Sequence, residues 1–127
     1  MAYYFSKMID VPFDQAIEKA IAALKAHGFG VLTRIDVQAT LKEKIGAQFR
    51  PYTILGACNP KMAHQALQAE DKIGTMLPCN VIVQEIDGKS EVAAVDPVAS
   101  MQAIDNRALG AIAGKVREEL KAAVQSL

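Results

Sequence analysis

The chain has 127 residues, and its 14 basic and 14 acidic side chains leave no net charge at pH 7. This length suits one domain, so we expect residues 1–127 to fold as a single domain. A neutral chain without a basic stripe argues against nucleic acid as the main partner. No apolar run approaches the roughly 18 residues that span a membrane. The first residues also lack the pattern of a signal peptide, so we expect a soluble, cytoplasmic protein with no membrane partner.

The first elements in chain order are a strand at 3–9 and a helix opened by Pro12. Proline suits a first helical position because its missing N–H is not needed there. Apolar residues then recur at helical spacing and form one stripe: Phe13, Ile17, Ala20, Ile21 and Leu24. Gly28 follows the last turn, where glycine commonly ends a helix. We therefore predict an amphipathic helix that packs one face on the core.

The segment after residue 36 is compatible with two structures. Alternate residues from Ile35 to Leu41 are apolar, as in a strand, whereas Val37, Leu41 and Ile45 lie on one face of a helix. The strong helix formers that follow Leu41 favour a short helix, closed by Gly46.

Further strands are predicted at 30–36, 52–57, 79–86 and 91–95. The last two are joined across Asp87-Gly88, which is a strong hairpin signal. Several of these strands are apolar on both faces, and such strands are normally covered on both faces. Helices can cover one side, so we expect a second copy of the chain to cover the other as a homodimer. The alternative is that the helices divide between the two faces.

Two more long helices are predicted. Asn59 followed by Pro60 matches a helix cap and a first helical position, so one helix begins there and runs to about Asp71. A helical turn or two is expected within 97–104. Asp105 or Asn106 then caps a final helix. Its apolar stripe contains Leu109, Ile112, Val116, Leu120, Val124 and Leu127.

Five segments, in order along the chain, carry a resemblance to a known family. They are GFGVL at 28–32, DVQATLKEKIG at 36–46, LGACNP at 55–60, LPCNV at 77–81 and AVDP at 94–97. With them, the chain resembles the domain-of-unknown-function family 302, a family of small bacterial and archaeal proteins. The elements predicted from the residues run in the order β-α-β-(α)-β-α-β-β-α, with about five strands. The resemblance implies that they form a compact α+β fold, with a mostly antiparallel sheet and helices packed against it. It also supports a helix across 38–45, and it supplies no established reaction.

The only two cysteines stand in similar settings, Cys58-Asn59-Pro60 and Pro78-Cys79-Asn80. Cys58 precedes the predicted cap, so the positive end of the helix can favour its thiolate and lower its pKa. The alternative is that Cys58 is a small apolar residue at the end of a buried strand. In a cytosolic protein, both cysteines are expected to be free thiols rather than a structural disulfide.

These residues are the candidate site. Cys58 and Cys79 are the candidate catalytic thiols, and both cysteines with Asn59 and Asn80 are candidate binding residues. If the two cysteine-bearing strands are neighbours, both thiols lie at one end of the sheet, but adjacency does not follow from the sequence. The two asparagines are also typical of residues that satisfy turn backbone.

No metal site or cofactor is expected. His64 with the two cysteines would give part of a zinc ligand set, but there is no Cys-x-x-Cys pair and no evident fourth ligand. His64 instead falls on the polar face of its predicted helix. Asp36 and Asp96, each at a strand end, fit general acid or base groups and fit helix caps equally well.

Two hypotheses follow. The favoured one is a homo-oligomeric module that binds a small ligand or a protein partner, with the cysteines packed as core. The other is a thiol-dependent sulfur carrier or redox protein that uses Cys58 with Cys79. No general base or complete catalytic set accompanies the thiols, so the sequence does not favour an enzyme.

Overall fold

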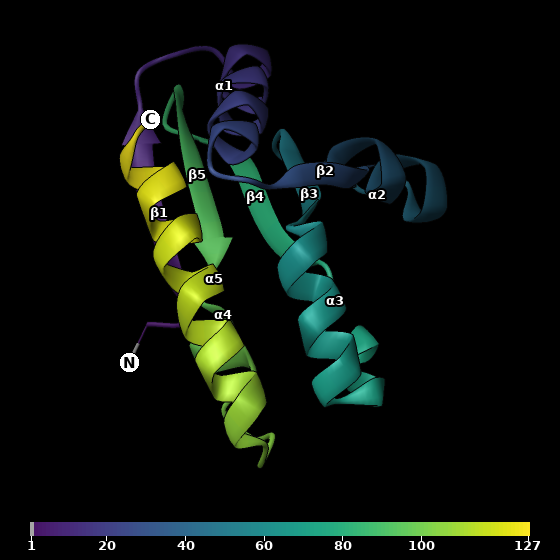
Figure 1. Cartoon of the computed structure of the whole chain (residues 1–127). Helices are drawn as coiled ribbons and strands as arrows, with labels where there is room; N and C mark the ends of the chain where they lie inside the picture. The colour runs from purple at the N-terminus through teal and green to yellow at the C-terminus, as the bar shows by residue number, and fades with distance from the viewer. Residues whose placement is uncertain (1) are drawn as a thin grey trace.

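The computed structural model describes residues 2–127 as an α+β fold with one antiparallel sheet, in the strand order β1-β5-β4-β3-β2 (Figure 1). The strands are β1 (Tyr4–Ile9), β2 (Gly30–Asp36), β3 (Tyr52–Cys58), β4 (Cys79–Ile86) and β5 (Lys89–Val95). The helices are α1 (Phe13–Ala26), α2 (Val37–Ile45), α3 (Pro60–Ala69), α4 (Pro97–Ser100) and α5 (Arg107–Gln125), with a 3₁₀ helix η1 (Asp71–Met76). Within residues 2–127, no helix is long and apolar enough to cross a membrane. The predicted fold class and element order are confirmed.

The ambiguous segment after β2 is helical because Asp36 caps it. The Asp36 side chain accepts a hydrogen bond from the backbone N–H of Ala39 at 2.9 Å. Gly46 ends α2 with a φ of 66°, a left-handed conformation that glycine adopts without strain. A capped start and a glycine stop outweigh the short stretch of strand-like alternation.

Other element ends also follow local chemistry. The hairpin between β4 and β5 turns at Asp87 and Gly88, whose φ angles of 50° and 77° are those of the tight turn that this dipeptide favours. Asn106, one of the two predicted caps, begins α5 by accepting from the N–H of Leu109 at 3.2 Å. Helix α3 stops two residues earlier than expected, and η1 continues the chain after it.

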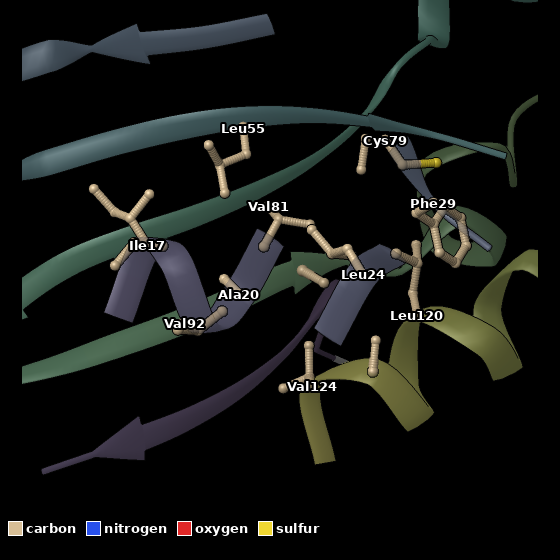
Figure 2. Packing of buried hydrophobic residues seen from close by; sticks show 14 of the residues in the cluster. Ile17, Ala20, Leu24, Phe29, Leu55, Cys79, Val81, Val92, Leu120 and Val124 are labelled. Carbon is tan, nitrogen blue, oxygen red and sulfur yellow. The ribbon is translucent and has the colours of Figure 1, made fainter. Parts of the chain in front are cut away.

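The main core lies between one face of the sheet and helices α1 and α5 (Figure 2). Alternate residues of the three central strands supply the sheet side of this core: Leu55, Ala57, Cys79, Val81, Val83, Val92 and Ala94. Ile17 and Leu24 of α1 and Leu120 and Val124 of α5 belong to the helix side of the same core. Figure 1 shows α1 and α5 on the same side of the sheet, while α2 projects from its β2 end.

The opposite face of the sheet is more open. A row of directly paired residues crosses all five strands: Ile35, Ile54, Ile82, Ala93 and Ser6. Ile82 and Ala93 help to line a hollow of about 440 Å³ on this face. Ile35 remains 47% exposed at the β2 edge.

The stripe of α1 provides the first test of the fold. Ile17→Ala and Leu24→Ala each remove a fully buried side chain, so each is expected to lower the free energy of unfolding by about 2–5 kcal/mol. Lys19→Ala, on the exposed face of the same helix, should be nearly neutral. Urea unfolding measures all three, and equal losses at all three positions would contradict this packing.

Candidate functional site

The register of β3 against β4 brings the two cysteine segments together. Ala57 lies directly opposite Cys79, and Cys58 is the next residue along β3. The two strands are therefore neighbours, which the sequence left open. Both cysteines line one cavity at this end of the sheet.

The cavity lies between the main core and a second, smaller core formed by α3, η1 and the start of α5. Its volume is about 30 Å³, which is room for one or two water-sized groups. Its walls come from the strand ends, α3, α5 and the Pro97–Met101 segment. They contain Phe29, Ala57, Cys58, Asn59, Met62, Ala63, Ala66, Leu77, Pro78, Cys79, Pro97, Met101, Leu109, Ile112, Ala113 and Val116. No charged side chain is among these wall residues.

The start of α3 fixes the Cys58 side of the cavity. The Asn59 side chain accepts a hydrogen bond from the N–H of Met62 at 3.1 Å, as the predicted cap should. Pro60 occupies the first helical position. Cys58 is therefore held between the last residue pair of the sheet and the first turn of the helix, where its side chain is half-buried.

Pro78 fixes the Cys79 side. Leu77, before it, is extended at φ −116° and ψ 154°, as expected for a residue that precedes proline. Pro78 also packs closely over Gly56 of β3. A Cβ atom at Gly56 would lie 2.7 Å from Pro78 Cγ and 2.2 Å from Thr33 Oγ1, so the residue must be glycine for these strands and this turn to approach.

Cys79 is the more buried of the two cysteines, with 7% of its surface exposed. Figure 2 shows its sulfur near the ring of Phe29, which lines the same cavity. Burial, and in second place the nearby charge of a Cys58 thiolate, raise the pKa of Cys79 to about 11. At neutral pH the Cys79 thiol is therefore protonated.

Two methionines complete the sulfur groups around the cavity, and no sequence pattern distinguishes them as site residues. Met62 comes from the first turn of α3 and Met101 from the residue after α4. A methionine on an apolar helix face is ordinarily a core residue, so its type alone gives no signal. Only the packing of α3 and α4 around the strand ends places both side chains beside the cysteines.

The remaining candidates lie elsewhere. Asn80 points away from Cys79 and lines the hollow on the open face of the sheet. His64 is exposed on α3, as its position on the polar face predicts. No group of three or more His, Cys, Asp or Glu side chains within residues 2–127 is arranged to hold a metal ion.

Asp36 and Asp96 are both helix caps. Asp96 accepts from the N–H of Val98 at 3.0 Å, and its other carboxylate oxygen accepts from Arg117 Nε at 3.2 Å. Asp96 is buried, and its ion pair with Arg117 joins the end of β5 to the middle of α5. Neither aspartate lines the cavity.

The raised pKa of Cys79 predicts a loss of stability in alkali. Between pH 9 and about pH 11, the unfolded chain releases the Cys79 proton while the folded chain retains it, so stability falls as the pH rises through this range. The loss should reach roughly 2–3 kcal/mol relative to Cys79→Ala. Urea unfolding of both proteins at pH 8, 9, 10 and 11 measures it, and parallel curves for the two proteins would contradict a buried, protonated thiol.

A comparison with solved structures finds the same architecture in another protein. The crystal structure of an uncharacterized conserved protein DUF302 from Bacillus stearothermophilus superimposes with a TM-score of 0.91 and 28% sequence identity. The alignment covers 98% of each chain. No curated protein matches the sequence.

The sequence profile of one family matches residues 5–127, which is nearly the whole chain and includes both cysteine segments. The description of that family is "Domain of unknown function DUF302". The resemblance found from the sequence motifs is thus confirmed, and the chain belongs to the DUF302 family.

Proposed function

We propose that this protein is a homodimeric module that binds a small ligand in the cavity between β3, β4, α3 and α5. One observation carries the ligand site: two segments of unusual and similar sequence, far apart in the chain, line the same cavity with both cysteines. Binding sites are typically concave, mostly apolar and equipped with few polar groups. The cavity has these properties, with Asn59 as the only amide side chain in its walls.

The dimensions of the cavity limit the ligand to a few atoms. Sites for drug-sized molecules have volumes of ~300–1,000 Å³, whereas this cavity has about 30 Å³. Sulfur and apolar side chains make up the rest of the walls, so they supply most side-chain contacts to the ligand, and Asn59 can add hydrogen bonds from its amide.

Xenon, a small apolar probe, tests this site without knowledge of the natural ligand. Labelled methionine methyl groups allow each side chain to be followed by NMR. We expect saturable xenon-dependent shifts at Met62 and Met101, which line the cavity. Met8 and Met76, both more than 40% exposed and outside the cavity, serve as internal controls.

Ala113→Leu adds a larger side chain to the cavity wall and should abolish those shifts. Equal shifts at all four methionines, or no shifts at Met62 and Met101, would contradict a binding cavity.

The open face of the sheet supports the homodimer. The apolar row through Ile35, Ile54 and Ile82 is the side of the strands that α1 and α5 do not cover. Isolated apolar residues on a surface are normal, but a continuous apolar row across four neighbouring strands, from Ile35 to Ala93, is typical of an interaction site. A second copy presents the same row, and a neutral chain does not repel its copy.

The residues around this row are of the kinds enriched at interfaces. Tyr4 and Tyr52 border the hollow. Arg50 stacks 5.6 Å from the centre of the Tyr52 ring, and its Nε donates to Gln84 at 2.8 Å. Tyrosine and arginine are over-represented at protein interfaces because they combine apolar area with hydrogen-bonding groups. This composition supports association through the open face.

Light scattering at micromolar concentration should give about twice the chain mass of 13.7 kDa. Ile35→Lys places a charge within the apolar row and should shift the mass toward that of the single chain. Leu67→Lys, at a similarly exposed position on α3 away from the open face, should leave the dimer intact. A single-chain mass for the unaltered protein would exclude the dimer, and dissociation by Leu67→Lys alone would exclude this face.

The thiol-dependent alternative has one observation in its favour, because both cysteines border the same cavity. A resolving thiol, however, must ionise and reach its partner. The buried Cys79, with a pKa of about 11, is poorly suited to that role at neutral pH. We therefore favour ligand binding.

A further inference from the structure

We propose that the ligand of this cavity is a single soft monovalent cation of the Cu(I) class, bound through the sulfur of Cys58 with Cys79, Met62 and Met101 as further sulfur donors. The inference rests on the small-ligand site proposed above and names the chemistry of that ligand. It starts from the gathering of two thiols and two thioethers around one small cavity.

The donor types select the ion. Thiolate and thioether sulfur are soft ligands that favour Cu(I), whereas carboxylate and carbonyl oxygens favour Mg²⁺ and Ca²⁺. The cavity walls contain no carboxylate or imidazole. Zinc is normally held by four ligands from Cys, His, Asp or Glu, and residues 2–127 contain no cluster of even three such side chains. The wall chemistry thus favours a soft ion over a hard or borderline one.

The size of the cavity agrees with an ion. Space for one or two water-sized groups accommodates a single metal ion without opening the core. The methionine side chains have three rotatable bonds each, so their sulfur atoms can turn toward an ion while their apolar parts stay packed. Met62 and Met101 are both only half-buried, and they come from separate segments, because Met62 belongs to α3 and Met101 follows α4.

The charge balance favours a monovalent ion. Binding replaces the proton of the Cys58 thiol: a sulfur lone pair forms the bond to the cation, the proton passes to solvent, and no atom is oxidised or reduced. One thiolate with one M⁺ is neutral, which suits a site without charged walls. Cys79 lines the same cavity and lies beside the bound ion as a further sulfur donor.

The test is an anaerobic titration of the intact protein with Cu(I), using bicinchoninate as a competing coloured chelator. We expect one tightly held Cu(I) per chain, with a new ultraviolet absorption from the sulfur-to-metal bond. Cys58→Ser, which keeps the side-chain size but offers a hard oxygen, should weaken binding by at least roughly 100-fold. Far-UV circular dichroism and thermal unfolding check that the Cys58→Ser variant keeps its fold.

The methionines provide matched variants. Met62→Leu combined with Met101→Leu keeps the apolar volume and removes both thioethers, so it should weaken Cu(I) binding by roughly tenfold or more while stability changes little. Met8→Leu combined with Met76→Leu removes two exposed sulfurs outside the cavity and should leave the affinity unchanged. Equal affinities for these two double variants would overturn the thioether ligands, and an affinity unaffected by Cys58→Ser would overturn the site.

The xenon experiment separates this inference from the proposed function. Xenon-dependent shifts at Met62 and Met101 without specific Cu(I) binding would refute the soft cation and leave the small-ligand cavity standing. Absence of both would refute the cavity as a ligand site. Cu(I) that binds and abolishes the xenon shifts would support both.

Discussion

The antiparallel register between β3 and β4 determines which side chains this protein buries and which it presents. Because successive residues of a strand point to opposite faces, a shift of one residue would exchange the two faces of the sheet. Leu55 and Val81 form a directly opposed pair under α1, while Ile54 and Ile82 form the adjacent pair on the open face. The observed register therefore sets both the core and the apolar row that we assign to dimer formation.

The same register determines the geometry of the candidate site. Cys79 belongs to the buried set because it opposes Ala57, and Cys58 follows at the point where β3 passes into α3. The sheet thus sets the position of the Cys79 sulfur, and the cap that begins α3 sets the position of the Cys58 sulfur. Gly56 is needed for this arrangement, because its missing side chain lets Pro78, the residue before Cys79, pack over β3. A site built on strand ends and a capped helix start holds its groups more firmly than a site on a free loop.

Much of the local structure could be predicted from the sequence because its causes are local. The caps at Asp36 and Asn59 and the turn at Asp87-Gly88 are short-range chemistry. The opposite directions of Cys79 and Asn80 also follow from strand alternation, once β4 is known to begin at Cys79. The grouping of Met62 and Met101 with the cysteines could not be predicted, because it depends on how α3, α4 and α5 pack on the strand ends. The sequence contains no short-range signal for that packing.

The proposed ligand site and the proposed dimer interface share strand β4. Cys79 and Asn80 are consecutive residues, yet the first lines the cavity under the helices and the second lines the hollow on the open face. An ion held at Cys79 and a second copy seated near Asn80 would therefore contact the same length of backbone from opposite sides. A closely packed strand cannot shift on one face without shifting on the other. Occupation of the cavity and closure of the dimer would therefore each restrict β4 at this point. If both proposals hold, β4 would connect the ligand and the partner directly, through one strand and without any moving domain.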